Sequence, residues 1–255
     1  MNETILRCEN SPEGIFTAVY TAYEKKLDPA VTHIETEEEA NYRLFAVYME
    51  VETSGWKAQK VERSLGKRLG QRAAQAIWYA VLSEDAGRAD AVYHTIALGL
   101  ERRGPGSVMD CLQEPAVNRV EKLALTVRNE AHHYMGFLRF SRLESGIMYS
   151  EIEPKNQVLV LLGEHFQDRF GEEDFLILDK RRKQYLVHRK GQSYFLYESG
   201  EDFPMGPVET AKGEEEIREL FRLFVKTIAI DERENKALQR QLLPLRFRPN
   251  MIDFQ

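Results

Sequence analysis

Hydrophobic residues in the first half of the chain recur mainly at intervals of three and four, the spacing of one helical face. After a short strand-like stretch at 4–9, aromatic and aliphatic side chains repeat with this spacing over 16–27. A second strand-like stretch occupies 43–53. Further helices are predicted over 54–82, 85–101 and 114–135, with another beginning at 107. The first half is therefore expected to be mainly helical.

The pattern changes after residue 135. Residues 136–154 form two β-rich runs joined near Ser145 and Gly146, which predicts a β-hairpin. A helix is predicted over 156–170 and an amphipathic one over 214–230, with acidic residues in the first turn of the latter. Three more short strands are predicted from the sequences DFLILD (174–179), QYLVHR (184–189) and SYFLYE (193–198).

Together these elements predict the α+β class. A helical N-terminal half would pack on an antiparallel sheet of about five strands, with a C-terminal helix at the end. We expect a single domain over 1–255. The alternative is a boundary near residue 135 that divides it into a mainly helical part (10–135) and a part containing the sheet and further helices (136–255). The opening strand could pair with the later sheet.

Composition narrows the class of protein. The chain is 43% hydrophobic and 30% charged, as in an ordinary globular protein, and its net charge is -6. Contact with nucleic acid would therefore depend on local basic patches. Two distant cysteines, Cys8 and Cys111, exclude a disulfide framework and argue against a cysteine-rich zinc site or an iron–sulfur cluster. With no apolar signal or membrane segment, a cytoplasmic location without membrane contact is expected.

Three segments concentrate positive charge: the helix from Lys57 to Arg72, residues 180–190, and residues 236–250. Basic patches release counterions on binding phosphates, and an aromatic residue among them, such as Phe247, can stack on an unpaired base. The alternative is that each patch is an ordinary solvated face or a docking surface for an acidic protein. The candidate nucleic-acid-binding residues here are Lys57, Lys60, Lys67, Arg181, Arg182, Arg240, Arg246 and Arg248.

The stretch NEAHHYMGFLRFSR (129–142) contains the pair Glu130 and His133, spaced as metal ligands are in di-iron helical bundles. No second such pair exists, so no metal site is predicted, and the histidines could serve only to end a helix and pack. Alternatively, several basic residues could form one polar surface, made up of His132, Arg139, Arg142, His165 and Arg169. This surface could bind phosphate, or its arginines could instead pair with Glu151 and Glu153.

Catalytic signatures are missing from the sequence. It has no P-loop, no H-E-x-x-H and no G-x-S-x-G motif, and no glycine-rich dinucleotide-binding turn, so no cofactor is predicted. The three-cysteine motif of radical-SAM enzymes is also missing. Glu130, His132 and His165 remain weak candidates for acid–base chemistry. A non-catalytic role is the favoured interpretation.

An ordered series of segments resembles a known family. It comprises GIFTAVYTAY, KAQKVERSL, EAHHYMGFLRF, IEPKNQVLVLLGEHFQDRF, FLILDKRR and NKALQRQLLPLRFRPN. Over nearly the whole chain the series resembles bacterial DNA metabolism or DNA repair proteins of undefined molecular role. The positions that match the central motif are Glu130, His132, Gly136, Phe137, Arg139 and Phe140. The closing motif differs, since Phe247 and Arg248 replace the usual Tyr-Trp pair.

The resemblance implies a companion of a radical-SAM protein that modifies or repairs DNA. In other members a similar domain is fused to a uracil-DNA-glycosylase-like domain, and this chain would be the stand-alone form. It supplies no catalytic residues. The first hypothesis is a DNA-binding accessory subunit that presents nucleic acid to the radical-SAM partner. The second is a protein-interaction module without nucleic-acid contact, and the third is a nucleic-acid-processing enzyme that uses His132 and His165.

Overall fold

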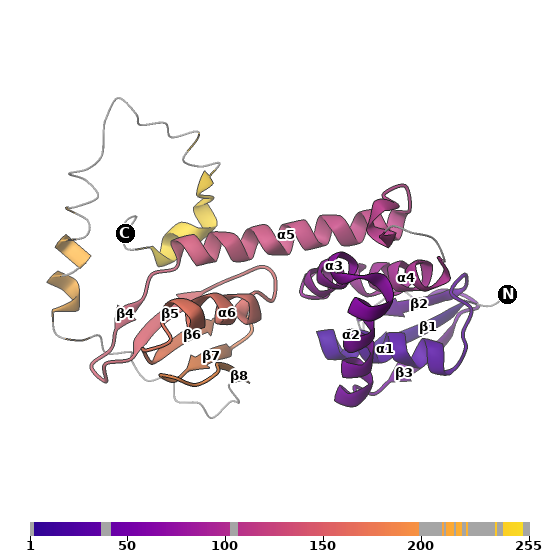
Figure 1. Ribbon diagram of the computed structural model, residues 1–255, viewed down its shortest axis with the longest axis horizontal. Coiled ribbons are helices and arrows are strands. Elements are labelled where there is room, and N and C mark those ends of the chain that lie inside the picture. The colour runs from indigo at the N-terminus through magenta and orange to yellow at the C-terminus, as the bar shows by residue number, and fades with distance from the viewer. Residues whose placement is uncertain are drawn as a thin grey trace. The chain divides into compact units, whose positions relative to one another are not determined.

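The chain divides into two compact units, Met1–Arg128 and Asn129–Gln255 (Figure 1). The computed structural model describes residues 3–36, 42–102 and 107–198, and beyond these only 211, 213–216, 218–220, 223, 238 and 242–251. Both units mix helices and strands, which confirms the α+β class. Among the described residues the strands form two sheets, three-stranded in the first unit and five-stranded in the second. The predicted sheet of about five strands is the second of these.

The first unit is built around a parallel sheet with strand order β2-β1-β3. Its elements are β1 (Thr4–Cys8), α1 (Pro12–Glu24), β2 (Thr32–Glu35), β3 (Val47–Val51), α2 (Gly55–Leu69), α3 (Gln71–Val81), α4 (Arg88–Glu101), the short 3-10 helix η1 (Val108–Asp110) and the start of α5 (Pro115–Phe137). The opening strand thus pairs with β2 and β3 and not with the later sheet. Helix α1 packs on all three strands and α4 packs on β2.

The central position of β1 explains its buried residues. Ile5 and Leu6 point to opposite faces of the sheet and are both fully buried, so both faces of the strand are covered at this point. Helix α1 begins with an N-cap, since Ser11 Oγ accepts a hydrogen bond from the Gly14 amide at 3.0 Å and Pro12 is the first helical residue. Phe16 and Val19 of α1 are then buried in the core.

The helix predicted over 54–82 is two helices. Gly70 separates α2 from α3 with φ 85° and ψ 161°, a conformation that is accessible to glycine and costly for other residues. The apolar spacing runs across the break, with Leu65, Leu69 and Ala73 all buried, so hydrophobic periodicity does not reveal it. The helix predicted from residue 107 is only the single turn η1.

The second unit contains the sheet β4-β5-β6-β7-β8. Its elements are the end of α5, β4 (Ser141–Arg142), β5 (Met148–Ile152), α6 (Leu159–Arg169), β6 (Phe175–Asp179), β7 (Gln184–His188), β8 (Phe195–Glu198) and the 3-10 helix η3 (Leu245–Asn250). The predicted hairpin at 136–154 is confirmed by the antiparallel pair β4–β5. The pair β5–β6 is parallel, contrary to the antiparallel expectation, because α6 connects these strands as a crossover.

Part of the C-terminal prediction falls outside the described residues. Within the helix predicted over 214–230, residues 214–216, 218–220 and 223 are helical. Of the third basic segment, Lys236 and Arg240 lie outside the described residues. None of the helices in the described ranges has an apolar stretch long enough to span a membrane.

Candidate nucleic-acid interface

Helix α2 presents a stripe of cations that begins at an exposed tryptophan. Trp56, Lys60, Arg63 and Lys67 follow one another at intervals of four, three and four, so they share one side of the helix, about one turn or 5.4 Å apart. All four are exposed, as is Arg68 beside them. The opposite side buries Ala58, Val61, Leu65 and Leu69 in the core of the first unit. We call these five exposed residues the α2 face.

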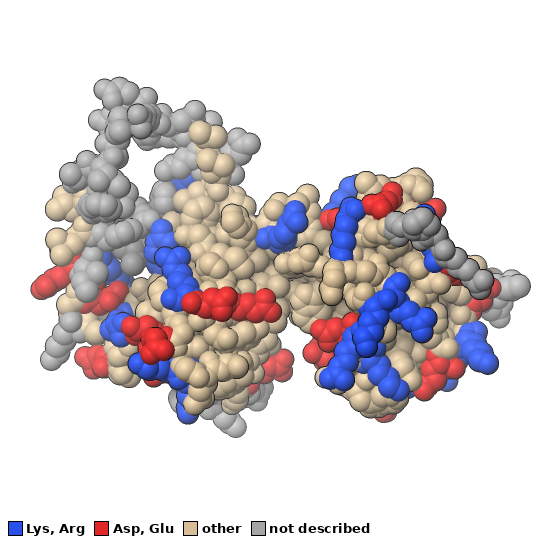
Figure 2. Space-filling model, in the orientation of Figure 1, with Lys and Arg blue, Asp and Glu red and all other residues tan. Residues whose placement is uncertain are grey.

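Two neighbouring cations, Lys57 in the first turn of α2 and Arg72 at the start of α3, are neutralised, whereas those of the α2 face are not. Lys57 Nζ lies 2.7 Å from Glu24. Arg72, just after the break, lies 2.6 Å from Asp110 and 3.3 Å from Glu121. Among the described residues, no carboxylate lies within ion-pair distance of the four cations of the α2 face. Figure 2 shows the resulting continuous blue area over α2.

Aromatic rings adjoin this positive surface. The side chain of Trp56 is 54% exposed, and the edge of its ring meets Tyr20, with ring centres 5.4 Å apart. Lys60 Nζ lies 4.6 Å from the Trp56 ring centre and 5.6 Å from that of Tyr20. An exposed aromatic platform next to cations is the combination found in grooves for single-stranded nucleic acid.

Three of the six cations in the second basic segment, residues 180–190, are neutralised by acids of its own unit. Lys180 Nζ lies 2.8 Å from Glu153 and 3.2 Å from Glu151, the two acids considered as alternative partners of the hairpin arginines. The hydrogen bond that Lys180 donates to Glu153 raises the pKa of Lys180, although partial burial opposes this shift. Lys190 pairs with Glu172 at 2.9 Å. We call residues 180–190 the β6–β7 segment, since they include the turn between these strands.

The side chain of Arg182 stabilises the β6–β7 segment through internal contacts. The fully buried Asp179 accepts hydrogen bonds from the amides of Arg181 and Arg182, at 2.9 and 3.2 Å, and so closes the turn. Its other oxygen lies 2.8 Å from Arg182 Nη1. Arg182 also donates to the carbonyl oxygens of Pro154 and Lys155. The side chains of Arg181 and Arg189 remain exposed.

The third basic segment contributes to the core of the second unit. Phe247, expected to be available for stacking on a base, is 3% exposed and meets the edge of Tyr134 at 4.8 Å between ring centres. Arg246 covers the Phe247 ring and lies 3.5 Å from Glu130. Arg248 donates to the Leu243 carbonyl oxygen. That expectation for Phe247 is therefore wrong, because its ring is buried against His133, Tyr134 and Phe137 of α5.

Glu130, in the stretch NEAHHYMGFLRFSR (129–142), is a buried hydrogen-bond acceptor. Its side chain is 1% exposed and accepts hydrogen bonds from the amide nitrogens of Lys155 and Asn156, both at 2.9 Å, and from Asn156 Nδ2 at 2.6 Å. His133 stacks on Phe137 and contacts Phe247. Burial lowers the pKa of His133, and the charge of Arg246 lowers it further. The neighbouring His132 is exposed.

The remaining residues of the expected polar surface make mostly local contacts. Arg139 donates to the carbonyl oxygens of Gly136, in the last turn of α5, and of Leu138, just after this helix. Arg142 donates to the Gly146 carbonyl oxygen and pairs with Glu173 at 3.3 Å. Arg169 lies over the Phe170 ring. His165, on α6, is partly buried, and its Nε2 has no hydrogen-bond partner in the described structure.

Two features of the first unit were not foreseen. Trp56 was not singled out, although its spacing to Lys60 and Arg63 was visible in the sequence. The second is a cluster of His33, Asp90 and His94 beside a pocket. Asp90 and His94 are four residues apart on a helix, which was a usable signal, but His33 is far away in the sequence and nothing connects it to them before folding.

Comparison with known proteins identifies the family of this chain. No curated protein matches the chain. A solved structure described as a DHH domain of a member of the s1p family of ribosomal proteins is 13% identical, covers 73% of each chain and superimposes with a TM-score of 0.32. A family model for a domain of unknown function, DUF4130, matches residues 86–253. Because this match spans more than half of the sequence, the chain belongs to the DUF4130 family.

Proposed function

We propose that this protein binds single-stranded nucleic acid on the α2 face. The observation that carries the proposal is the exposed stripe Trp56, Lys60, Arg63 and Lys67, whose cations have no carboxylate partner among the described residues. A surface of this kind neutralises phosphates, releases their counterions and supplies affinity that does not depend on sequence. Trp56 adds a ring on which an unpaired base can stack.

The energies favour an exchange of partners at Trp56. The contact of Lys60 with the exposed ring is worth about 0.5–1 kcal/mol, whereas a stacked base is worth about 1–3 kcal/mol. A base can therefore replace the ammonium group on the ring. Lys60 is then released to contact a phosphate next to that base. Duplex DNA offers no unpaired base for this exchange, which is why we propose a single strand as the ligand.

The biological nucleic acid is proposed to be DNA, in keeping with the resemblance to DNA metabolism and repair proteins. In this role the chain is a non-catalytic accessory protein that holds DNA for a radical-SAM partner. Membership of the DUF4130 family is compatible with this role and does not specify it. No residue is assigned to catalysis, and Glu130 in particular is committed to internal hydrogen bonds.

The test is a salt titration of binding. The full chain is titrated into a fluorescein-labelled single-stranded oligonucleotide and anisotropy is recorded from 50 to 200 mM salt. Four phosphate contacts predict that log K falls with log salt with a slope of about -3. Reversing charge with Lys60→Glu and Lys67→Glu should weaken binding at least about tenfold and flatten this slope.

The matched control is the double variant Arg181→Glu and Arg189→Glu, which reverses the same number of exposed charges on the β6–β7 segment. Its affinity should remain within about threefold of the wild type. Equal losses from both double variants would show that net charge and not the α2 face governs binding. No binding at 50 mM salt would overturn the proposal and favour the protein-interaction module.

A further inference from the structure

His33, Asp90 and His94 place three metal-ligand atoms close together in the first unit. His33 is on β2, while Asp90 and His94 lie one turn apart on α4. Asp90 Oδ1 is 3.1 Å from His33 Nδ1 and 3.4 Å from His94 Nε2. All three ligand atoms lie within 4.8 Å of one another. The cluster involves neither the α2 face nor any residue of the second unit.

A single oxygen of Asp90 is approached by three nitrogen atoms. Besides the two imidazoles, the Ile34 amide donates to the same Oδ1 at 3.2 Å. A carboxylate oxygen offers about two lone-pair positions, so three donors exceed what it can accept well. The hydrogen bond from the Ile34 amide already links β2 to α4. The two histidines converge on the same oxygen, which is an arrangement that a bound cation would require.

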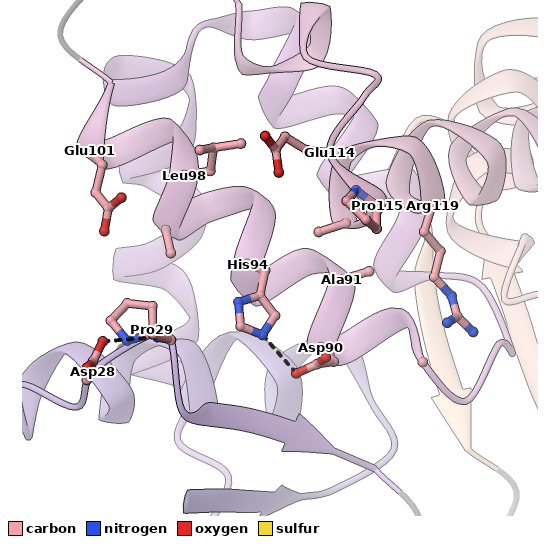
Figure 3. A pocket seen from close by; sticks show the side chains of 14 residues that line it. Asp28, Pro29, Asp90, Ala91, His94, Leu98, Glu101, Glu114, Pro115 and Arg119 are labelled. Atoms are coloured by element: carbon pink, nitrogen blue, oxygen red, sulfur yellow. Dashed lines mark hydrogen bonds and ion pairs between the residues drawn. The ribbon is translucent and has the colours of Figure 1, made fainter. Parts of the chain in front are cut away.

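The cluster borders an acidic pocket of about 580 Å³. Asp90 and His94 line it together with Asp28, Glu101 and Glu114, as Figure 3 shows. The one cation among its lining residues is Arg119, which donates to Asp85 at 3.0 Å. An excess of carboxylates over unpaired cations gives the pocket a negative potential, which favours a positive ion.

The cluster is open to solvent. The side chains of His33, Asp90 and His94 are 24%, 35% and 28% exposed, so an ion can reach them from solvent. The nearby Arg43 is paired with Glu3 and Glu35.

We propose that His33 Nδ1, His94 Nε2 and the Asp90 carboxylate bind a divalent transition-metal ion. Two histidines and one carboxylate are a recurring set in open zinc and non-haem iron sites. With metal–nitrogen distances of about 2.0–2.1 Å, adjacent ligand atoms lie roughly 3.0–3.4 Å apart, close to the two separations from Asp90. Three protein ligands leave the remaining coordination positions open toward the pocket. This inference is independent of the proposed function.

The test uses Co²⁺ and Zn²⁺ on the full chain. Co²⁺ should bind with a stoichiometry of one and produce visible absorption bands, and Zn²⁺ should displace it. Asp90→Asn, His33→Ala and His94→Ala should each weaken Co²⁺ binding at least about tenfold. His132→Ala and His165→Ala, which alter histidines of the second unit, should leave it unchanged.

A second measurement does not depend on variants that could misfold. In the wild-type chain, Zn²⁺ should protect His33 and His94 from diethyl pyrocarbonate while His132, which is exposed, continues to react. Peptide mass mapping measures the three positions in one sample. Equal modification of His33 and His94 with and without Zn²⁺ would overturn the proposal. The same conclusion would follow if folded Asp90→Asn bound Co²⁺ as tightly as the wild type.

Discussion

The α2 face and the β6–β7 segment are similarly rich in lysine and arginine, but the acids around them differ. In the β6–β7 segment, three of the six cations, Lys180, Arg182 and Lys190, pair with acids of the second unit. Among the described residues, the ion pairs on or next to α2 involve only Lys57 and Arg72, which lies just beyond the helix, and none involves a cation of the α2 face. The count of basic residues in a segment therefore does not predict a binding surface, because acids supplied by other elements decide it.

The difference follows from secondary structure. Strand β6 has β5 as its parallel neighbour, with Asp179 in register with Ile152. This register brings Glu151 and Glu153 alongside the beginning of the β6–β7 segment, where they pair with Lys180. A helix that packs on one side only has no such neighbour along its outer side. The cations of α2 that follow Lys57 consequently face solvent.

The largest expected effect concerns stability in the β6–β7 segment. Replacing Asp179 with alanine should lower the free energy of unfolding by about 3 kcal/mol, because it leaves the partly buried Arg182 without its carboxylate and two amides without their acceptor. Urea denaturation measures the change. Lys67→Ala on the α2 face is the control and should stay within about 0.5 kcal/mol of the wild type. Similar losses in both variants would remove the distinction between the two surfaces.

The second effect concerns binding at Trp56. Replacing it with alanine should weaken single-stranded DNA binding by about 1–3 kcal/mol, or about 5- to 150-fold, through loss of base stacking. Trp56→Phe should retain much of the affinity. The chain has two tryptophans, so Trp78→Phe leaves Trp56 as the sole indole reporter, and its fluorescence should be quenched by the oligonucleotide. Unchanged affinity in Trp56→Ala would exclude stacking at this position.

The smallest effect is a pH dependence of stability, which is expected for the second unit. Burial lowers the pKa of His133 in the folded state, so the unfolded chain binds more protons as pH falls through the ordinary histidine range near 6.5. The contribution of neutral His133 to stability is thus complete above that pH and is lost on acidification. The urea midpoint should drop between pH 7.5 and 5.5, and less so in His133→Phe. His132→Gln, at an exposed position, should behave as the wild type.

Much of the fold could be predicted from the sequence, and the elements that were missed were missed for physical reasons. The short apolar runs of β6 and β7 and the apolar spacing of α6 predicted those elements directly. The break at Gly70 was missed because the apolar spacing continues through it from Leu69 to Ala73. The short strand β2 was missed because four residues next to an acidic run carry little periodicity. The parallel β5–β6 pair was foreseeable from the strand–helix–strand order.

The candidate sites were predicted less completely. The sequence correctly located the cations of α2, because helical spacing shows which residues share a side. It could not show that Glu172 lies beside Lys190 or that Phe247 turns inward, since both contacts depend on tertiary packing. The cluster of His33 with Asp90 was missed for the same reason, as the two residues come together only when α4 packs on β2.

The buried carboxylate of Glu130 also affects the order in which the two units fold during translation. Arg246, which pairs with this carboxylate, leaves the ribosome on the order of 100 residues later, and the loop that the pair closes carries the corresponding entropy cost. The first unit is contiguous in sequence and can fold while the rest is still being translated. The second unit can join Glu130 to Arg246 only after residue 246 has emerged, so this buried ion pair forms later in translation than the core of the first unit.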